Sequence, residues 1–186
     1  MKACGWDLYD SRIAEFRDAR TRLPEAIHVQ FESCRNNGPR YLIKTRKKTV
    51  ALQDGWLEGE NSTSYSFANE QPAPGYWMFK YQGYEWNGIT FVNRQTGALK
   101  NTPGNSCGAP VFNSAGNRLI IRCYPDYANN ASDLYYISLE SGIVVKRLQR
   151  NPPEGELTVN WKNAKTVAVG FTPQGGSTQR KTYRTP

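Results

Sequence analysis

The feature that most constrains the fold is an internal repeat in the second half of the chain. Ile89–Leu99 (ITFVNRQTGAL) and Leu134–Val144 (LYYISLESGIV) align at an offset of 45 residues. Each consists of a strand-like run, a polar turn that ends near a Gly, and a second strand-like run. Further on, Asn117–Ile121 aligns with Ala164–Ala168 at an offset of 47 residues. A strand unit that recurs about every 40 to 50 residues is typical of the four-stranded blades of a β-propeller.

We therefore predict a mainly β fold of antiparallel four-stranded, blade-like repeats. With 186 residues the chain is too short for a complete ring of blades, so the expected architecture is a partial β-propeller. A generic antiparallel sandwich with similar hairpins is the alternative. The expected strands of the repeat region cover residues 76–81, 88–93, 98–102, 109–113, 118–124, 133–139, 143–149, 156–161 and 165–171.

We expect a single domain over residues 1–186, in which residues 1–52 form a helix and strands ahead of the repeats. Apolar residues on one helical face predict one short N-terminal helix over residues 10–23, which Pro24 ends. Alternating apolar and polar residues from Ile27 onward predict a half-buried strand.

Three further segments complete the expected organisation. Residues 53–74 are rich in Gly, Ser, Asn and Pro, which predicts a long loop. The blade-like repeats are expected over residues 76–171. Residues 172–186 are polar and contain two adjacent glycines, which predicts a flexible tail.

The four cysteines suggest disulfide bonds. They do not form a CxxC pair, and a single histidine in the chain does not suit a zinc site. An even number in a loop-rich chain predicts two disulfides and an oxidising compartment. Of the three possible connectivities, sequence proximity favours Cys4–Cys34 and Cys107–Cys123. Four reduced, buried thiols in a cytosolic protein are the alternative. The disulfide interpretation predicts a periplasmic or secreted protein whose signal peptide has been removed.

The charge distribution narrows the range of partners. Lys and Arg number 24 and Asp and Glu number 16, and the excess of positive charge lies in residues 1–48 and 143–186. Without a basic run interleaved with aromatic residues, we do not expect nucleic-acid binding. An acidic protein or an anionic envelope polymer remains open as a partner. No apolar run approaches the ~18 residues of a membrane helix, so no membrane span is expected.

Signals for catalysis are weak. His28 is the only imidazole and lies on the polar face of a predicted strand. We find no nucleophile elbow, phosphate loop or dinucleotide fingerprint, and we predict no catalytic residue, metal or cofactor. A hydrolase that uses loop carboxylates, drawn from Asp126, Asp133 and Glu140, is a third and weaker hypothesis beside the two binding functions described below.

Two loops have the composition of a recognition surface, with Tyr, Asn and Ser next to cysteines. The first is Asn101–Cys107 and the second is Tyr124–Ser132. An ordinary long hairpin loop is the alternative for the second. The residues we expect to bind a partner are Asn105, Ser106, Tyr124, Asp126, Tyr127, Asn129, Asn130 and Ser132.

The stretch Ile89–Gln149 resembles the extracytoplasmic immunity proteins that neutralise peptidoglycan amidase effectors of type VI secretion. The resemblance lies in the run Ile89–Gly97, a Cys-bearing linker and the run Val111–Ile120. It implies a partial, propeller-like β fold. It also implies an inhibitor whose serine-bearing loop, between the second and third strands of a blade, enters the Cys–His active-site cleft of the toxin. The matching segment here is Tyr124–Ser132, in which Ser132 is the only serine.

These observations together predict an immunity-type protein that is not an enzyme. Its partner would be a cognate secreted effector, such as a Cys–His amidase, and its mechanism would be occlusion of the partner's active site. The longer expected N-terminal helix, the loop at residues 53–74 and the basic charge depart from the family's pattern. An envelope-associated, propeller-like module or lipoprotein that binds glycan or scaffolds other proteins is the alternative.

Overall fold

The computed structural model describes residues 23–30, 37–55, 63–68, 75–83, 85–125, 131–140, 142–163 and 165–186. Within these residues every regular element is a β-strand and every strand pair is antiparallel, which confirms the predicted mainly β, antiparallel fold. The helix expected over residues 10–23 lies outside the described residues, except for Leu23 at its end.

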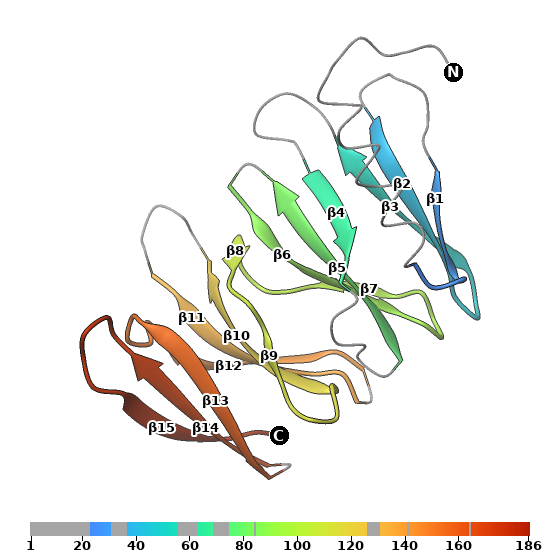
Figure 1. The fold of residues 1–186 in the computed structure, drawn as a ribbon. Helices are drawn as coiled ribbons and strands as arrows, with labels where there is room; N and C mark the ends of the chain where they lie inside the picture. Colours follow the sequence, from blue (N-terminus) through green and yellow to red (C-terminus); the bar gives the residue numbers. More distant parts are fainter. Residues whose placement is uncertain are drawn as a thin grey trace.

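The strands form three open sheets in which most neighbours in the sheet are also neighbours in the chain (Figure 1). The first sheet has seven strands in sequence order: β1 (Ile27–Gln30), β2 (Asn37–Lys44), β3 (Thr49–Gly55), β4 (Thr63–Phe67), β5 (Tyr76–Gly83), β6 (Asn87–Asn93) and β7 (Leu99–Asn101).

The second sheet has five strands: β8 (Ser106–Cys107), β9 (Val111–Phe112), β10 (Arg118–Tyr124), β11 (Asp133–Ser138) and β12 (Val144–Arg150). Its order is β12-β11-β10-β8, and the short strand β9 also pairs with β10. The third sheet has three strands: β13 (Glu156–Asn163), β14 (Thr166–Thr172) and β15 (Gln179–Arg184).

The three sheets stack as four layers, because the first sheet folds over on itself. Among the described residues its halves, β1–β3 and β4–β7, are paired in the strand register only at Gly55 with Thr63. Apolar side chains of both halves meet in one cluster: Ile27, Val29, Tyr41, Ile43, Val50, Leu52, Phe79 and Val92. The layers are therefore β1–β3, β4–β7, β8–β12 and β13–β15, in chain order along the stack (Figure 1).

Two further apolar clusters hold the remaining layers together. The second cluster joins β4–β7 to β8–β12 and contains Tyr76, Met78, Ile89, Phe91, Leu119, Ile121, Cys123, Ile137 and Leu139. The third cluster joins β8–β12 to β13–β15 and contains Ile120, Leu134, Tyr136, Val167, Val169, Phe171 and Tyr183. Each inner layer thus buries both of its faces, and each outer layer buries one.

The sequence patterns of the strands follow from their places in the stack. Successive side chains of a strand point to opposite faces. Strand β6 lies in an inner layer, and its five central residues are all buried. Strand β1 lies in an outer layer, and buried Ile27 and Val29 alternate with exposed His28 and Gln30, as predicted. The continuous apolar run of β6 therefore reflects burial on both faces, and the alternation of β1 reflects burial on one face.

The repeat segments do form corresponding hairpins, β6–β7 and β11–β12. The sheets, however, have seven, five and three strands rather than four each. The Gly55–Thr63 pair merges two groups of strands into one sheet, and β8 and β9 both pair with β10.

Three strands lie where the sequence predicted none, and one of them is the two-residue strand β8, within the expected loop Asn101–Cys107. Strand β4 lies within the expected loop at residues 53–74, and β15 lies within the expected tail at residues 172–186. In β15 only Tyr183 is buried, so the strand has no apolar alternation that sequence could show. Backbone pairing with β14, from Phe171–Gln179 to Thr166–Arg184, holds it in place.

The side chain of Arg122, in the third layer, contacts the fourth layer and the connection that leads to it. The Arg122 guanidinium donates hydrogen bonds to the carbonyl oxygens of Pro153, at 2.7 Å, and of Gly155, at 3.3 Å. The guanidinium carbon also lies 5.3 Å from the centre of the Phe171 ring. A single side chain thus contacts both the connection between the two layers and the core of the fourth.

We expect Arg122→Gln to lower the free energy of unfolding by about 2 kcal/mol, because two hydrogen bonds from a charged donor are lost. Urea denaturation followed by tryptophan fluorescence measures the change. Arg180→Gln, at an exposed position on β15, is the matched control and should stay within about 0.5 kcal/mol of the wild type. Equal losses in the two variants would contradict the role assigned to Arg122.

Candidate functional site

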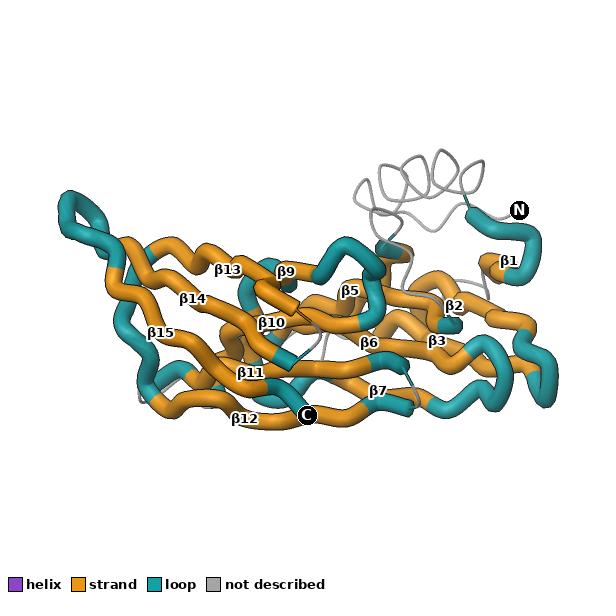
Figure 2. Tube along the Cα trace, turned by 90° about the horizontal axis from the view of Figure 1, so that it is seen from below, coloured by secondary structure: helices purple, strands orange, loops and turns teal. Residues whose placement is uncertain are grey.

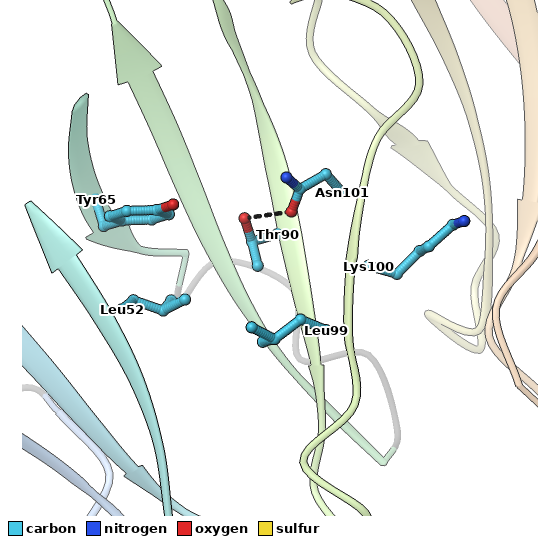
Figure 3. Close-up of a pocket in the computed structure, with 6 residues that line it drawn as sticks. All are labelled: Leu52, Tyr65, Thr90, Leu99, Lys100 and Asn101. Atoms are coloured by element: carbon cyan, nitrogen blue, oxygen red, sulfur yellow. Dashed lines mark hydrogen bonds between the residues drawn. The ribbon is translucent and has the colours of Figure 1, made fainter. Parts of the chain in front are cut away.

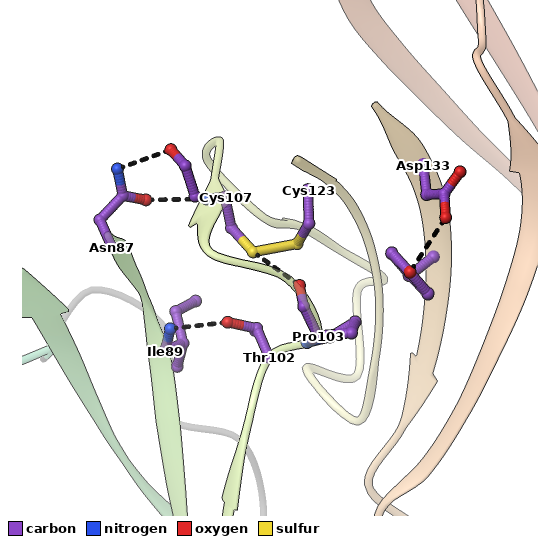
Figure 4. The surroundings of a disulfide bond; sticks show 9 residues. Asn87, Ile89, Thr102, Pro103, Cys107, Cys123 and Asp133 are labelled. Carbon is purple, nitrogen blue, oxygen red and sulfur yellow. Dashed lines mark hydrogen bonds between the residues drawn. A yellow bond between two sulfur atoms is a disulfide. The ribbon is translucent and has the colours of Figure 1, made fainter. Parts of the chain in front are cut away.

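A disulfide bond lies at the centre of the candidate site. Cys107 of β8 and Cys123 of β10 are directly paired across two antiparallel strands, with their Cα atoms 4.0 Å apart (Figure 4). This confirms the predicted Cys107–Cys123 pairing. Cys4 and Cys34, the other expected pair, lie outside the described residues.

Asn87 of β6 holds the disulfide segment against the neighbouring layer (Figure 4). Its side-chain oxygen accepts a hydrogen bond from the Cys107 backbone N–H at 2.8 Å, and its Nδ2 donates to Ser106 Oγ at 3.0 Å. Its backbone N–H donates to the Asn105 carbonyl at 2.8 Å. The segment is therefore held by a covalent bond on one side and by three hydrogen bonds on the other.

Three of the predicted partner-binding residues come together here. Tyr124 lies opposite Ser106 in the strand register, and the Asn105 N–H donates to the Tyr124 carbonyl at 2.8 Å. The turn before them requires glycine: Gly104 has φ +90°, and a Cβ there would lie 2.9 Å from the Tyr124 carbonyl oxygen. Asn105 is exposed, and Ser106 and Tyr124 are half-buried. We call Asn105, Ser106 and Tyr124 the clamped cluster.

The other predicted residues are distributed differently. Ser132 is only 7% exposed, and its carbonyl accepts a hydrogen bond from the Asn151 N–H at 2.7 Å. Its side chain is therefore not presented as an inserting serine would have to be. The remaining four predicted residues lie outside the described residues: Asp126, Tyr127, Asn129 and Asn130.

The structure separates the carboxylates that could have formed a catalytic pair. Asp133 is buried and forms an ion pair with Arg147 at 3.3 Å. Glu140 forms an ion pair with Arg118 at 2.8 Å. Asp133 also accepts a hydrogen bond from the Tyr135 hydroxyl at 3.2 Å, and burial together with the Asp133 charge raises the pKa of Tyr135. These contacts give both carboxylates a structural role, and Asp126 lies outside the described residues.

A groove beside the clamped cluster, lined by both polar and apolar residues, is not predicted from the sequence. Its volume is about 320 Å³, and it lies between the layers β4–β7 and β8–β12. Strands β4, β5 and β6 supply polar side chains, and Gly108 and Pro110 form part of the opposite wall. The polar side chains are Ser64, Ser66, Lys80, Gln82 and Asn87.

The sequence does not predict the groove, because β4 falls within the loop expected at residues 53–74. The signal was present, since Ser64 and Ser66 alternate with Tyr65 and Phe67. In a strand this alternation sends the serines to one face and the aromatic rings to the other. The rings pack on the first apolar cluster, which leaves the hydroxyls in the groove.

Two further properties concern other kinds of site. Among the described residues, no three His, Cys, Asp or Glu side chains lie close enough to hold a metal ion together. The described part of the chain also contains no helix with the length and apolar character of a membrane span. His28 is exposed on β1, on the polar face that the sequence predicted.

Comparison with known protein families finds no match for this chain. Comparison with curated protein sequences likewise finds no significant relative.

Proposed function

We propose that this protein is an immunity-type inhibitor that binds a secreted toxin and covers its active site, with a peptidoglycan-degrading effector as the target class. The observation that supports this is the clamped cluster: polar and aromatic residues held rigidly at the end of a sheet. The named target class rests on the resemblance of Ile89–Gln149 to immunity proteins of that kind.

Rigidity is the physical property that such an inhibitor needs. Binding costs conformational entropy when loops and side chains become ordered, and a surface that is already ordered avoids much of this cost. The disulfide and the Asn87 hydrogen bonds fix the backbone of Asn105 and Ser106 before any partner arrives. The cluster then offers an exposed amide, a hydroxyl and an aromatic ring to a partner.

The groove beside the clamped cluster extends this surface. Its hydroxyl, amide and ammonium groups match the hydrogen-bonding groups of an extended peptide segment. A partner that places its cleft over the clamped cluster could set a flanking segment into the groove. Substrate and water would then be excluded from the partner's catalytic residues, and no reaction by this protein is needed.

We also propose that the layers correspond to blades of a partial propeller. The supporting observation is the recurrence of meanders that pack face to face: β4–β7, β9–β12 and β13–β15. An extracytoplasmic location, periplasmic or secreted, is part of the proposal, because disulfides such as Cys107–Cys123 persist in oxidising compartments.

The test is capture of the partner, followed by an inhibition assay. Tagged protein is mixed with the secreted and periplasmic fractions of the host, and the captured protein is purified and assayed on peptidoglycan. We expect a hydrolase that is inhibited at a one-to-one ratio. Tyr124→Ala combined with Asn105→Ala should weaken binding about 30-fold, as expected for loss of central interface residues.

The matched control replaces Thr158 and Asn160, which are exposed on β13 in the outer layer, with alanine. This variant should bind as the wild type does. A captured partner without hydrolase activity would contradict the proposed target class. Equal binding by both double variants would contradict the assignment of the site.

The groove also favours a second candidate, an envelope module that binds glycan, because serine, glutamine and asparagine side chains suit sugar hydroxyls. NMR titration with soluble peptidoglycan fragments distinguishes the two. Shifts confined to groove residues such as Ser64, Gln82 and Asn87, without a captured hydrolase, would favour the glycan-binding function.

A further inference from the structure

Three edge strands lie along one side of the layered stack. Figure 2 shows β7, β12 and β15 together on that side, as the last strands of three successive layers. Contacts join them: Lys181 Nζ of β15 donates to Gln149 Oε1 of β12 at 3.4 Å, and the Tyr183 hydroxyl also donates to Gln149. Strand β12 is also linked to the layer that contains β7. Its Val145 packs on the second apolar cluster, which includes Phe91 of β6, and β6 pairs with β7.

These three strands are strongly cationic. Together they carry seven Lys and Arg side chains and no Asp or Glu. All seven are exposed, and of these seven only Arg147 forms an ion pair with another described residue, Asp133. We call this surface the cationic rim; its charged residues are Lys100, Lys146, Arg147, Arg150, Arg180, Lys181 and Arg184.

The rim also exposes aliphatic side chains. Among the described residues three large hydrophobic side chains are exposed, and two of them, Leu99 and Val144, each 47% exposed, lie on the rim strands β7 and β12. Leu99 directly precedes Lys100, and Val144 lies two residues before Lys146. Exposed aliphatic and cationic side chains therefore lie close together on the same two strands.

A cavity of about 360 Å³ adjoins the rim at β7. Figure 3 shows Leu99 directed toward Leu52 and Tyr65, and Lys100 directed away from them. On the wall between, Thr90 Oγ1 donates to Asn101 Oδ1 at 2.9 Å. The apolar part of this cavity gives Leu99 and any aliphatic chain beside it a nonpolar environment at the margin of a charged surface.

We propose that the cationic rim docks this protein on the surface of a membrane that carries anionic lipid. Its charges lie in rows on sheets that stack about 10 Å apart, so they form a two-dimensional array rather than a single line. Cations near an anionic bilayer each add to binding, and exposed aliphatic side chains gain by entering the headgroup boundary. A linear polyanion would satisfy the charges but would leave the exposed parts of Leu99 and Val144 in water.

The proposal is independent of the proposed inhibitor function. The rim uses none of the residues Asn105, Ser106 and Tyr124, so a protein docked by its rim could still present the clamped cluster. Docking would hold the inhibitor at the membrane surface, where an envelope-directed toxin would meet it.

The experiment is co-sedimentation of the purified full chain with vesicles. We expect binding to phosphatidylcholine vesicles that contain 40% phosphatidylglycerol and none to pure phosphatidylcholine. The triple variant Lys146→Gln, Arg150→Gln, Arg180→Gln should bind at least tenfold more weakly. The control Arg46→Gln, Lys47→Gln, Lys48→Gln removes the same net charge from the exposed β2–β3 turn and should bind as the wild type does.

Three outcomes would overturn the proposal. Equal loss in both triple variants would show that only net charge matters. Wild-type binding by a Leu99→Ser, Val144→Ser variant would show that the aliphatic side chains do not contribute and that the interaction is purely electrostatic. Tight binding to heparin or RNA without binding to the anionic vesicles would assign the rim to a linear polyanion. Circular dichroism of every variant confirms that it is folded.

Discussion

Alanine at Ile120 and alanine at Ile121 will each lower the free energy of unfolding by about 3 kcal/mol, although the two residues are adjacent in one strand. Both side chains are 0% exposed. Ile120 packs against Val167, Val169 and Phe171 of the fourth layer, in the third apolar cluster. Ile121 points to the opposite face and belongs to the second cluster. Each substitution leaves a cavity in a different core, so neither should be tolerated.

Urea denaturation of the two single variants measures this effect. The matched control is the outer strand β13, in which Val159 packs on the third cluster and the neighbouring Asn160 is exposed. There Val159→Ala should destabilise the protein and Asn160→Ala should leave it within about 0.5 kcal/mol of the wild type. A large effect at only one of the two isoleucines would contradict a layer that is covered on both faces.

Replacing both Cys107 and Cys123 with alanine should lower the free energy of unfolding by about 3 kcal/mol. The bond closes a loop with a sequence separation of 16 residues, and a cross-link of that length restricts the unfolded chain by about this amount. The pair is also part of the packed core, because Cys123 is fully buried and Cys107 packs beside it in the second cluster.

The same variant separates stability from recognition. Without the cross-link, Asn105 and Ser106 keep their hydrogen bonds to Asn87 but lose the covalent tie to β10. We therefore expect weaker binding of the captured partner under conditions where the variant is still folded. The control Ser106→Ala leaves the bond intact and should cost less than about 1 kcal/mol in stability. A double alanine variant that unfolds at the wild-type urea concentration would contradict this account of the bond.

Most strands could be predicted because their patterns are local. Alternation at Ile27–Gln30 and the apolar runs at 88–93, 118–124 and 133–139 reflect how many faces of each strand are covered, and that information is written in consecutive residues. The pairing of Cys107 with Cys123 could be predicted for a similar reason, because the two cysteines are only 16 residues apart in the sequence.

The prediction failed where long-range pairing outweighs local pattern. Strand β15 is polar and exposed along most of its length, and only its hydrogen bonds to β14 define it. Strand β4 lies in a Ser-rich segment whose aromatic residues find their neighbours on β5, where Tyr65 contacts Tyr81 and Phe67 contacts Phe79. The prediction of equal four-stranded sheets is wrong because a sequence repeat indicates only which segments form hairpins. It does not determine how many strands pair into one sheet.

The amino-acid sequence by itself thus specified the β class, the hairpin repeat, most of the strands and one disulfide, because each depends on residues near one another in the chain. The order of the layers, the groove between two of them and the cationic rim depend on which sheet faces cover each other. The tertiary structure decides which faces pack together. Ile120 and Ile121 are the same residue type in the sequence, and only the packing of the layers places them in different apolar clusters.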